Sequence, residues 1–492
     1  MSIRILILGL CLINSTLSFA KTKSEIVKRS PFIPEKLNFP AWNEEEIVMK
    51  LKASEKKRKP ANSANVIDQS MMSKELVSIQ SRIHKLKTSE DMDVLLEELD
   101  KNYESYPSDL KFYVTQIMPV KAFRGLFYRL KPLFDGRSNF VHSQILTTAK
   151  SMATRVQVFL PTDYADAGFQ YISTPYIMKN GRMVEGFGME EDLQVWMINE
   201  LLPLVNSSIT RLEKLNLVEP IVWDQKMVFG PKSFGDDVNR YKFIGEFEKN
   251  LALSSLYGSV ASIATARAYN VENAIGLYKE IGFLYGFDGF GLFNRIDGVS
   301  AEKVSKVMRK ADFSSTGTLI QDGDKWMAYA YGATQKSLKR LIDAWNLTSD
   351  ERKNENLYAF NIGFVNVNRD EVEENLKILN RVVSSKGVES LRSAVTGEVV
   401  QINYSKLFSS PPRDLKAFLP NQFDKNKNAS REVTLADGTK KMLNYRNYAQ
   451  GSAIAWDVKK FEDYFPSVKT NDDIYRTVRV LNHIQGNWLS IR

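Results

Sequence analysis

Apolar side chains in the N-terminal part of the chain recur at steps of mostly three and four residues. The positions are Ile79, Ile83, Leu86, Met92, Leu95, Leu96 and Leu99. Because residues at this spacing share one face of a helix, the pattern predicts successive amphipathic helices from about residue 71 onward. Ser89 and Ser108 precede apolar runs, and we expect each to cap a helix. A longer helix fits residues 138–158.

A second helical region covers residues 190–217, where Pro203 interrupts an apolar stripe. The stripe comprises Leu201, Val205, Ile209, Leu212 and Leu215. Residues 251–266 then contain no charged residue, but this run is shorter than the ~20 residues that a membrane span needs. We expect a buried central helix here, with Gly258 small enough to let neighbours approach closely. Residues 271–284 are its expected antiparallel partner.

Three turn dipeptides predict small β-hairpins between the helices. They are Asn180 with Gly181, Asp322 with Gly323, and Asp437 with Gly438. Both residues of the first dipeptide tolerate the positive φ that a type I′ turn requires. Runs of β-prone residues flank it, so the sequence predicts a hairpin near residues 171–187.

The C-terminal third mixes helices and short strands. Helices are expected at 300–310, 334–345 and 369–384, and strands at 357–367, 398–404 and 442–448. The predicted fold class is mostly α: antiparallel helix pairs, in a bundle or an irregular α-solenoid-like body, with small inserted β-hairpins. The expected division of the chain is a signal peptide (1–20), an extended or disordered proline-containing leader (21–69), a helical domain (70–310) and a mixed region (311–492).

The first residues have the features of a cleavable secretory signal. Arg4 precedes an apolar run over residues 5–13, and Ser18 and Ala20 supply the small residues that signal peptidase requires. Cleavage after Ala20 removes Cys11, the only cysteine of the chain. We therefore expect a periplasmic or secreted protein that depends on packing rather than on disulfides.

The charge of the chain restricts its partners only weakly. The formal net charge is +9 and charged residues make up 25% of the chain, which is an ordinary fraction. Nucleic-acid binding is not expected of an exported chain without a concentrated basic stripe. The expected partner is an envelope protein or a glycan, with no transmembrane segment after signal cleavage. Peripheral contact with anionic lipid is the weakest alternative.

No sequence motif assigns a catalytic residue, a metal or a cofactor. The chain has 3 histidines, and His84, His142 and His483 stand alone without partners at the spacing of metal ligands. Ser300 and Lys303 form an S-x-x-K tetrad, but the lysine-containing strand that should accompany it is missing. We expect Ser300 to cap a helix, and we predict no cofactor.

A group of carboxylates carries the alternative function, a hydrolase or lyase acting on an envelope or extracellular polysaccharide. Glu185, Glu190, Glu191 and Asp192 follow the first predicted hairpin closely. Acidic residues also favour the first turn of a helix. We prefer that structural interpretation for Glu190–Asp192.

The most unusual composition lies over residues 281–298, where glycines alternate with aromatic residues. Glycine lets the backbone approach a ligand, and aromatic faces stack on sugars or receive a peptide. Such a loop either lines a groove or folds back as a packed turn over the central helix. The predicted ligand-binding residues are Tyr285, Phe287, Asp288, Phe290, Phe293 and Arg295. The sequence thus favours an exported, non-catalytic envelope or secreted protein that binds a protein or glycan partner.

Overall fold

A computed structural model describes most of the chain after the predicted leader. The described residues are 67–133, 165–178, 180–217, 219–225, 240–277, 280, 306–347, 369–393, 396–419, 422–424, 430–434, 440–444 and 453–489. These residues are mostly helical, with small antiparallel two-stranded sheets, which confirms the predicted fold class. Their helices include none with the length and hydropathy of a membrane span. The predicted signal, most of the leader and the helix expected at 138–158 lie outside them.

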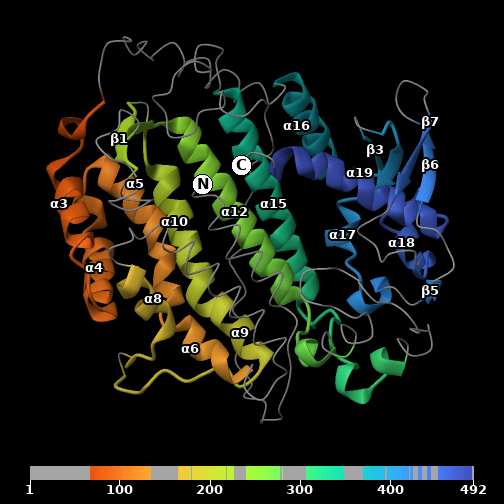
Figure 1. Ribbon diagram of the computed structural model, residues 1–492, viewed down its shortest axis with the longest axis horizontal. Helices are drawn as coiled ribbons and strands as arrows, with labels where there is room; N and C mark the ends of the chain where they lie inside the picture. The colour runs from red at the N-terminus through yellow and green to blue at the C-terminus, as the bar shows by residue number, and fades with distance from the viewer. Residues whose placement is uncertain are drawn as a thin grey trace.

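The helices and strands are named as in Figure 1. The main helices are α3 (Lys74–Ile83), α4 (Ser89–Lys101), α5 (Ser108–Ile117), α6 (Leu126–Leu130), α8 (Ala165–Ser173), α9 (Glu190–Trp196), α10 (Leu202–Lys214), α12 (Glu246–Ala268), α15 (Gly323–Asn346), α16 (Arg369–Ser384), α17 (Lys406–Ser409), α18 (Lys459–Glu462) and α19 (Asn471–Leu489). The strands are β1 (Ile221–Asp224), β2 (Tyr241–Ile244), β3 (Glu389–Arg392), β4 (Val399–Ile402), β5 (Gln422–Asp424), β6 (Ser430–Thr434), β7 (Lys440–Asn444) and β8 (Ala453–Ala455). They pair as β1–β2, β3–β4, β5–β8 and β6–β7.

The first helices form where the apolar spacing predicts them, and all seven of the predicted apolar positions are buried. Their caps differ from the prediction. Thr88, not Ser89, caps α4, because its hydroxyl accepts from the Asp91 amide while the Asp91 carboxylate accepts from the Thr88 amide. Ser108 is the first residue of α5, and Pro107 occupies the cap position without a side-chain hydrogen bond.

Pro203 marks a change of helix type, as its position in the stripe suggests. A π-helical turn at Met197–Leu201 joins α9 to α10, and Pro203 lies in the first turn of α10. Proline has no amide proton to donate into the preceding turn. A wider, π-helical turn before Pro203 therefore costs the helix no hydrogen bond from that residue. The apolar stripe behind it is buried throughout.

The central helix is α12, and it is buried as predicted: Leu253, Ile263 and Ala264 have no exposed surface. Its long antiparallel partner is α15, which lies beside it in Figure 1. Near the start of α12, Asn250 accepts a hydrogen bond from Arg340 near the end of α15. At the other end of the pair, Ala268 of α12 lies next to Gly323, the first residue of α15. The partner expected from the sequence was residues 271–284. Of these, residues 274–277 are helical, as is residue 280.

The first predicted hairpin exists in a shorter form. Tyr171 belongs to α8 rather than to a strand, and the pairing is an isolated bridge between Ile177 and Met183. The predicted type I′ turn is wrong, because Asn180 does not have a positive φ while Gly181 has φ 78°. The Gly181 amide donates to the Met178 carbonyl.

The second hairpin prediction is wrong. At the third predicted hairpin, paired strands lie on either side of the turn dipeptide. Asp322 is the N-cap of α15 and Gly323 is its first residue. Strands β6 and β7 pair antiparallel on either side of the Asp437–Gly438 dipeptide, which itself lies outside the described residues.

In the C-terminal third, the helices expected at 334–345 and 369–384 are confirmed by α15 and α16, and the strand expected at 398–404 by β4. Residues 306–308 of the helix expected at 300–310 are helical. Strand β7 begins two residues before the expected 442–448, and the expected strand 357–367 lies outside the described residues. The proposed domain division stays a prediction.

Candidate functional site

The whole sequence-predicted ligand site lies outside the described residues. This applies to all six predicted binding residues, from Tyr285 to Arg295, and also to Ser300, Lys303 and His142. Of the other histidines, His84 is the C-cap of α3 and His483 belongs to α19. The ligand-binding role of the six residues from Tyr285 to Arg295 stays a prediction.

The acidic cluster after the first hairpin is mainly the N-terminus of α9. Asp192, the third residue of α9, accepts from the Gly188 and Met189 amides and so bonds the backbone at the N-terminus of that helix. Glu190 is buried, and its Oε1 accepts from the Ile275 amide at 3.2 Å. Glu190 thereby fixes the segment that leads toward the glycine-aromatic run. Glu185 is exposed.

Glu191 differs from its neighbours in its electrostatics. Burial raises the pKa of its carboxyl group, and the nearby charges of Glu272 and Asp192 raise it further. Glu272 accepts a hydrogen bond from the Ser315 hydroxyl at 2.9 Å. A carboxyl group with a raised pKa is suited to proton donation. Glu191 is thus the member of the cluster that best fits a general acid.

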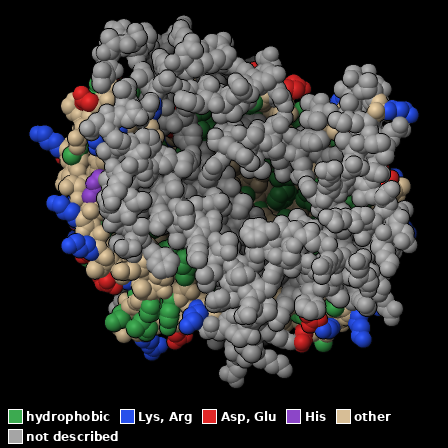
Figure 2. All heavy atoms as spheres, in the orientation of Figure 1, with side chains coloured by type: hydrophobic (Ala, Val, Ile, Leu, Met, Phe, Trp, Pro, Cys, Tyr) green, Lys and Arg blue, Asp and Glu red, His purple; other side chains and the backbone are tan. Residues whose placement is uncertain are grey.

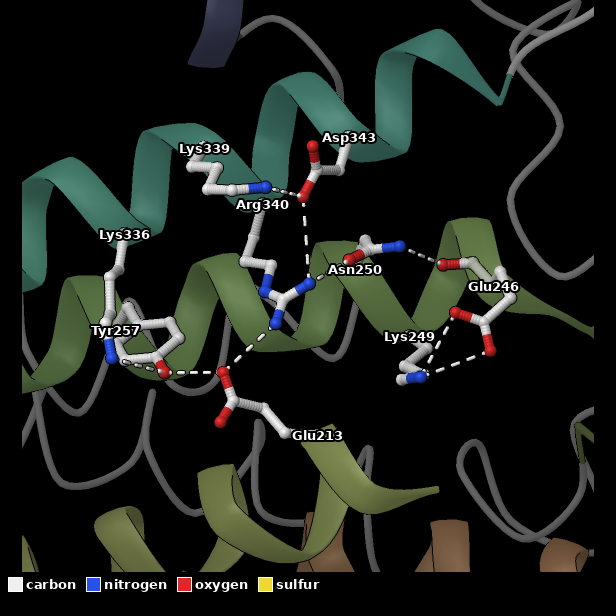
Figure 3. Close-up of polar contacts among 9 residues, drawn as sticks. All are labelled: Glu213, Glu246, Lys249, Asn250, Tyr257, Lys336, Lys339, Arg340 and Asp343. Carbon is white, nitrogen blue, oxygen red and sulfur yellow. Dashed lines mark hydrogen bonds and ion pairs between the residues drawn. The ribbon is translucent and has the colours of Figure 1, made fainter. Parts of the chain in front are cut away.

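A polar network crosses the helices α10, α12 and α15, and we call it the polar seam (Figure 3). Its 9 residues are Glu213, Glu246, Lys249, Asn250, Tyr257, Lys336, Lys339, Arg340 and Asp343. Arg340 joins the three helices: it donates to Glu213 Oε1 at 3.0 Å and to Asn250 Oδ1 at 3.3 Å. Tyr257 donates to the same Glu213 oxygen at 2.7 Å.

The seam keeps its central carboxylate ionised. Burial would raise the pKa of Glu213, but the hydrogen bonds from Tyr257 and Arg340 and the nearby charges of Arg340 and Lys336 hold it below its ordinary value. Burial lowers the pKa of Lys336, and Glu213 opposes that change. Asp343 accepts from Lys339 at 2.8 Å through one oxygen, while its other oxygen is buried without a hydrogen-bond partner.

The charges of the seam are paired mainly with one another, which suits it to fixing the register of three helices. Ser254 and Ser337 continue the polar contact between α12 and α15, where the Ser337 hydroxyl donates to the Ser254 carbonyl at 2.7 Å. A shift of one helix along another would unpair buried polar groups, which is costly. We interpret the seam as a structural element. Among the described residues, no group of three or more histidine, cysteine or acidic side chains is arranged to hold a metal.

The seam predicts a specific pH dependence of stability. The folded-state pKa of Glu213 is lowered, so its contribution is complete above the unfolded value of about 4.3 and is lost as the pH falls through the folded value. We expect Glu213→Gln to destabilise the protein at pH 7, with the difference from wild type shrinking in acid. Urea denaturation of the two proteins at pH 7 and at pH ~4 measures the difference in their free energies of unfolding. Glu104→Gln, at an exposed position, is the control and should show no such trend.

The hairpin formed by residues 174–184 presents two of the three most exposed large apolar side chains of the described residues. Ile177 is 68% exposed and Met183 is 52% exposed. The two residues are bridge partners, so their side chains lie opposite each other on the outer face of the hairpin. Figure 2 shows hydrophobic surface gathered at the lower left of the molecule, with basic side chains at its margins. We call the Ile177–Met183 pair the outer pair.

The inner face of the hairpin is fixed to the body of the protein. Val184 is buried, and its amide donates to the Tyr176 carbonyl at 2.8 Å. The Arg124 guanidinium lies over the Tyr176 ring and the Tyr171 ring, 5.1 Å from each centroid. Arg124 also donates to the Thr174 hydroxyl at 3.2 Å. The outer pair is therefore exposed on a rigid support.

Arg124 connects this support to α4. Its Nε donates to Asp93 at 3.0 Å and one terminal nitrogen donates to Glu90 at 3.1 Å, although the Arg124 side chain is only 6% exposed. Burial raises the pKa of Asp93 despite this cation. Sequence reasoning did not find Arg124 or the outer pair. The sequence does contain a signal for the outer pair: Ile177 and Met183 lie at equivalent positions on either side of the predicted turn.

Comparison with known proteins finds no match among protein-family models, curated proteins or solved structures. The geometry of the described residues therefore has to carry any functional inference.

Proposed function

We propose that the protein is an exported binding protein that contacts a partner protein through the outer pair of the 174–184 hairpin. The observation that carries this proposal is the exposure of Ile177 and Met183, opposite each other, on a hairpin whose other face is buried. Exposed apolar side chains on a well-packed support are typical of interaction surfaces. Export itself rests on the sequence of residues 1–20.

The chemistry of the hairpin favours a protein over a glycan or a lipid bilayer. The outer pair is aliphatic, whereas sugar rings stack best on aromatic faces. The turn beyond the pair carries the polar residues Asn180 and Arg182, both exposed. Inserting this tip into a bilayer would bring Arg182 toward the hydrocarbon, which costs about 3 kcal/mol at the centre.

Site-specific crosslinking tests the proposal. With the photoreactive residue benzoylphenylalanine at position 177, we expect an adduct with a defined protein in cells that make this chain, identified by mass spectrometry. Adding Met183→Lys should reduce its yield by about tenfold or more, because a charge would be buried in the contact.

Val94 provides the matched control for that experiment. It is an apolar residue on α4 with 64% exposure, and it lies outside the hairpin. The same photoreactive residue at position 94 should give no such adduct. A lipid adduct from position 177, or equal protein adducts from both positions, would exclude the proposed contact.

The second candidate function is a carboxylate-dependent hydrolase or lyase acting on an extracellular polysaccharide. The partial burial of the Glu191 carboxyl group near the charge of Glu272, which together raise its pKa, favours this candidate. On this alternative, Glu191→Gln and Glu272→Gln would each abolish turnover of peptidoglycan or polysaccharide, while Glu185→Gln at an exposed position would not. Equal activity in all three variants would exclude these residues as catalysts.

A further inference from the structure

The backbone of the 174–184 hairpin presents hydrogen-bonding groups that the described residues of the chain do not bond. The pairs Tyr176 with Val184 and Met178 with Arg182 point their groups inward across the hairpin. Residues 177 and 183 lie between these pairs, so their amide and carbonyl groups point away from it, one set at each edge. Neither residue makes a backbone hydrogen bond to any other part of the described chain.

The two edges differ in their ability to receive another strand. Pro175 lies on the edge of Ile177 and has no amide proton, so this edge lacks a donor where a partner strand would need one. The opposite edge contains Met183 and Glu185, whose amide and carbonyl groups make no backbone hydrogen bond within the part of the chain that the structure describes. It ends at Gly186, where a side chain would collide with Pro132, at 2.4 Å. An added strand of about four residues fits this edge.

We propose that the partner binds by adding an extended segment, antiparallel, to the Met183 edge. This deepens the proposed function and rests on it. Such β-augmentation gains affinity from main-chain hydrogen bonds and specificity from alternate side chains. The segment pairs directly with Met183 and Glu185 through its backbone.

Charges at the ends of the edge define the sequence of the segment. Arg182 and Glu185 are both exposed and of opposite sign, on either side of Met183. In an antiparallel pairing, an acidic residue lies opposite Arg182, an apolar residue opposite Met183 and a basic residue opposite Glu185. The segment therefore reads basic, any residue, apolar, acidic in the direction of its own chain.

A synthetic peptide tests this pairing on the full chain. The probe has the sequence Thr-Lys-Thr-Val-Glu-Thr, and its valine pairs with Met183. Two control peptides separate the backbone contribution from the charge contribution. The first has N-methylvaline in place of valine, which removes the donor to the Met183 carbonyl. The second has the lysine and the glutamate exchanged, which reverses the charge pairing. We expect the probe to shift the NMR amide signals of Met183 and Glu185, and either control to weaken binding about tenfold or more.

Substitutions at Met183 test the same pairing independently, through the yield of the adduct that the photoreactive residue at position 177 forms with the partner. Met183→Pro removes the outward amide, whereas Met183→Ala removes only the side chain, so the proline variant should lose far more adduct. The inference is wrong if the two variants behave alike, if the N-methylated peptide binds as well as the probe, or if the probe causes no shifts at about 5 mM. The proposed function fails separately, if Met183→Lys leaves the adduct from position 177 unchanged.

Discussion

Arg124→Leu is expected to lower the free energy of unfolding by about 3 kcal/mol, because it removes charge-assisted hydrogen bonds and two cation–π contacts together. The substitution leaves Asp93 without its cation in a site where burial already raises its pKa. The deficit should therefore shrink as the pH falls and Asp93 becomes protonated. Urea denaturation at pH 7 and at pH ~4 measures both effects.

Arg82→Leu is the matched control for this substitution. Arg82 forms a bidentate ion pair with Glu98, but 42% of its side chain is exposed and 37% of its partner's. Ion pairs at such positions contribute up to about 1 kcal/mol. A loss for Arg82→Leu as large as that for Arg124→Leu would contradict the special role of the buried guanidinium.

The Arg124 variant also connects stability to the proposed contact. Without the guanidinium between Tyr171 and Tyr176, the hairpin loses part of its support while the outer pair itself is unchanged. We expect the crosslink from position 177 to weaken, because a mobile hairpin must be ordered when the partner binds.

Helix positions were predictable because helical periodicity is a local property of the sequence. The apolar spacing before residue 100 and the uncharged run at 251–266 each led to the correct buried face. The partner of α12 was not predictable in this way, because α15 follows only after more than fifty residues and nothing in the local spacing specifies which helix it meets. Long-range pairing depends on shape and on contacts such as Arg340 with Glu213.

Turn dipeptides were less informative because one residue pair serves several backbone geometries. Asparagine with glycine predicted a type I′ turn, but the chain uses only the positive φ of Gly181. Aspartate with glycine predicted a hairpin at Asp322, whereas Asp322 occupies the N-cap position of α15 without a side-chain capping hydrogen bond. An aspartate is favourable at both places. The outer pair was missed for a related reason, since exposure depends on which face the body of the protein covers.

The position of Gly323 gives the second large expected effect. A Cβ atom on Gly323 would lie 2.6 Å from the Ala268 carbonyl oxygen and 2.6 Å from Leu319 Cγ. The absence of a side chain is therefore what lets the start of α15 cross the end of α12. We expect Gly323→Ala to lower the free energy of unfolding by about 2 kcal/mol, because a backbone oxygen must move to make room. Thermal or urea denaturation of the two proteins measures the difference.

Gly258→Ala is the control that separates close packing from helix propensity. Gly258 lies in the interior of α12, where an added Cβ would meet only Ser337 Oγ, at 3.5 Å. Alanine is favoured over glycine in a helix by about 1 kcal/mol, so this variant should be neutral or more stable. The sequence suggested that Gly258 permits the close approach, but the geometry gives that role to Gly323. Equal destabilisation by the two substitutions would mean that both glycines permit the close approach of α12 and α15.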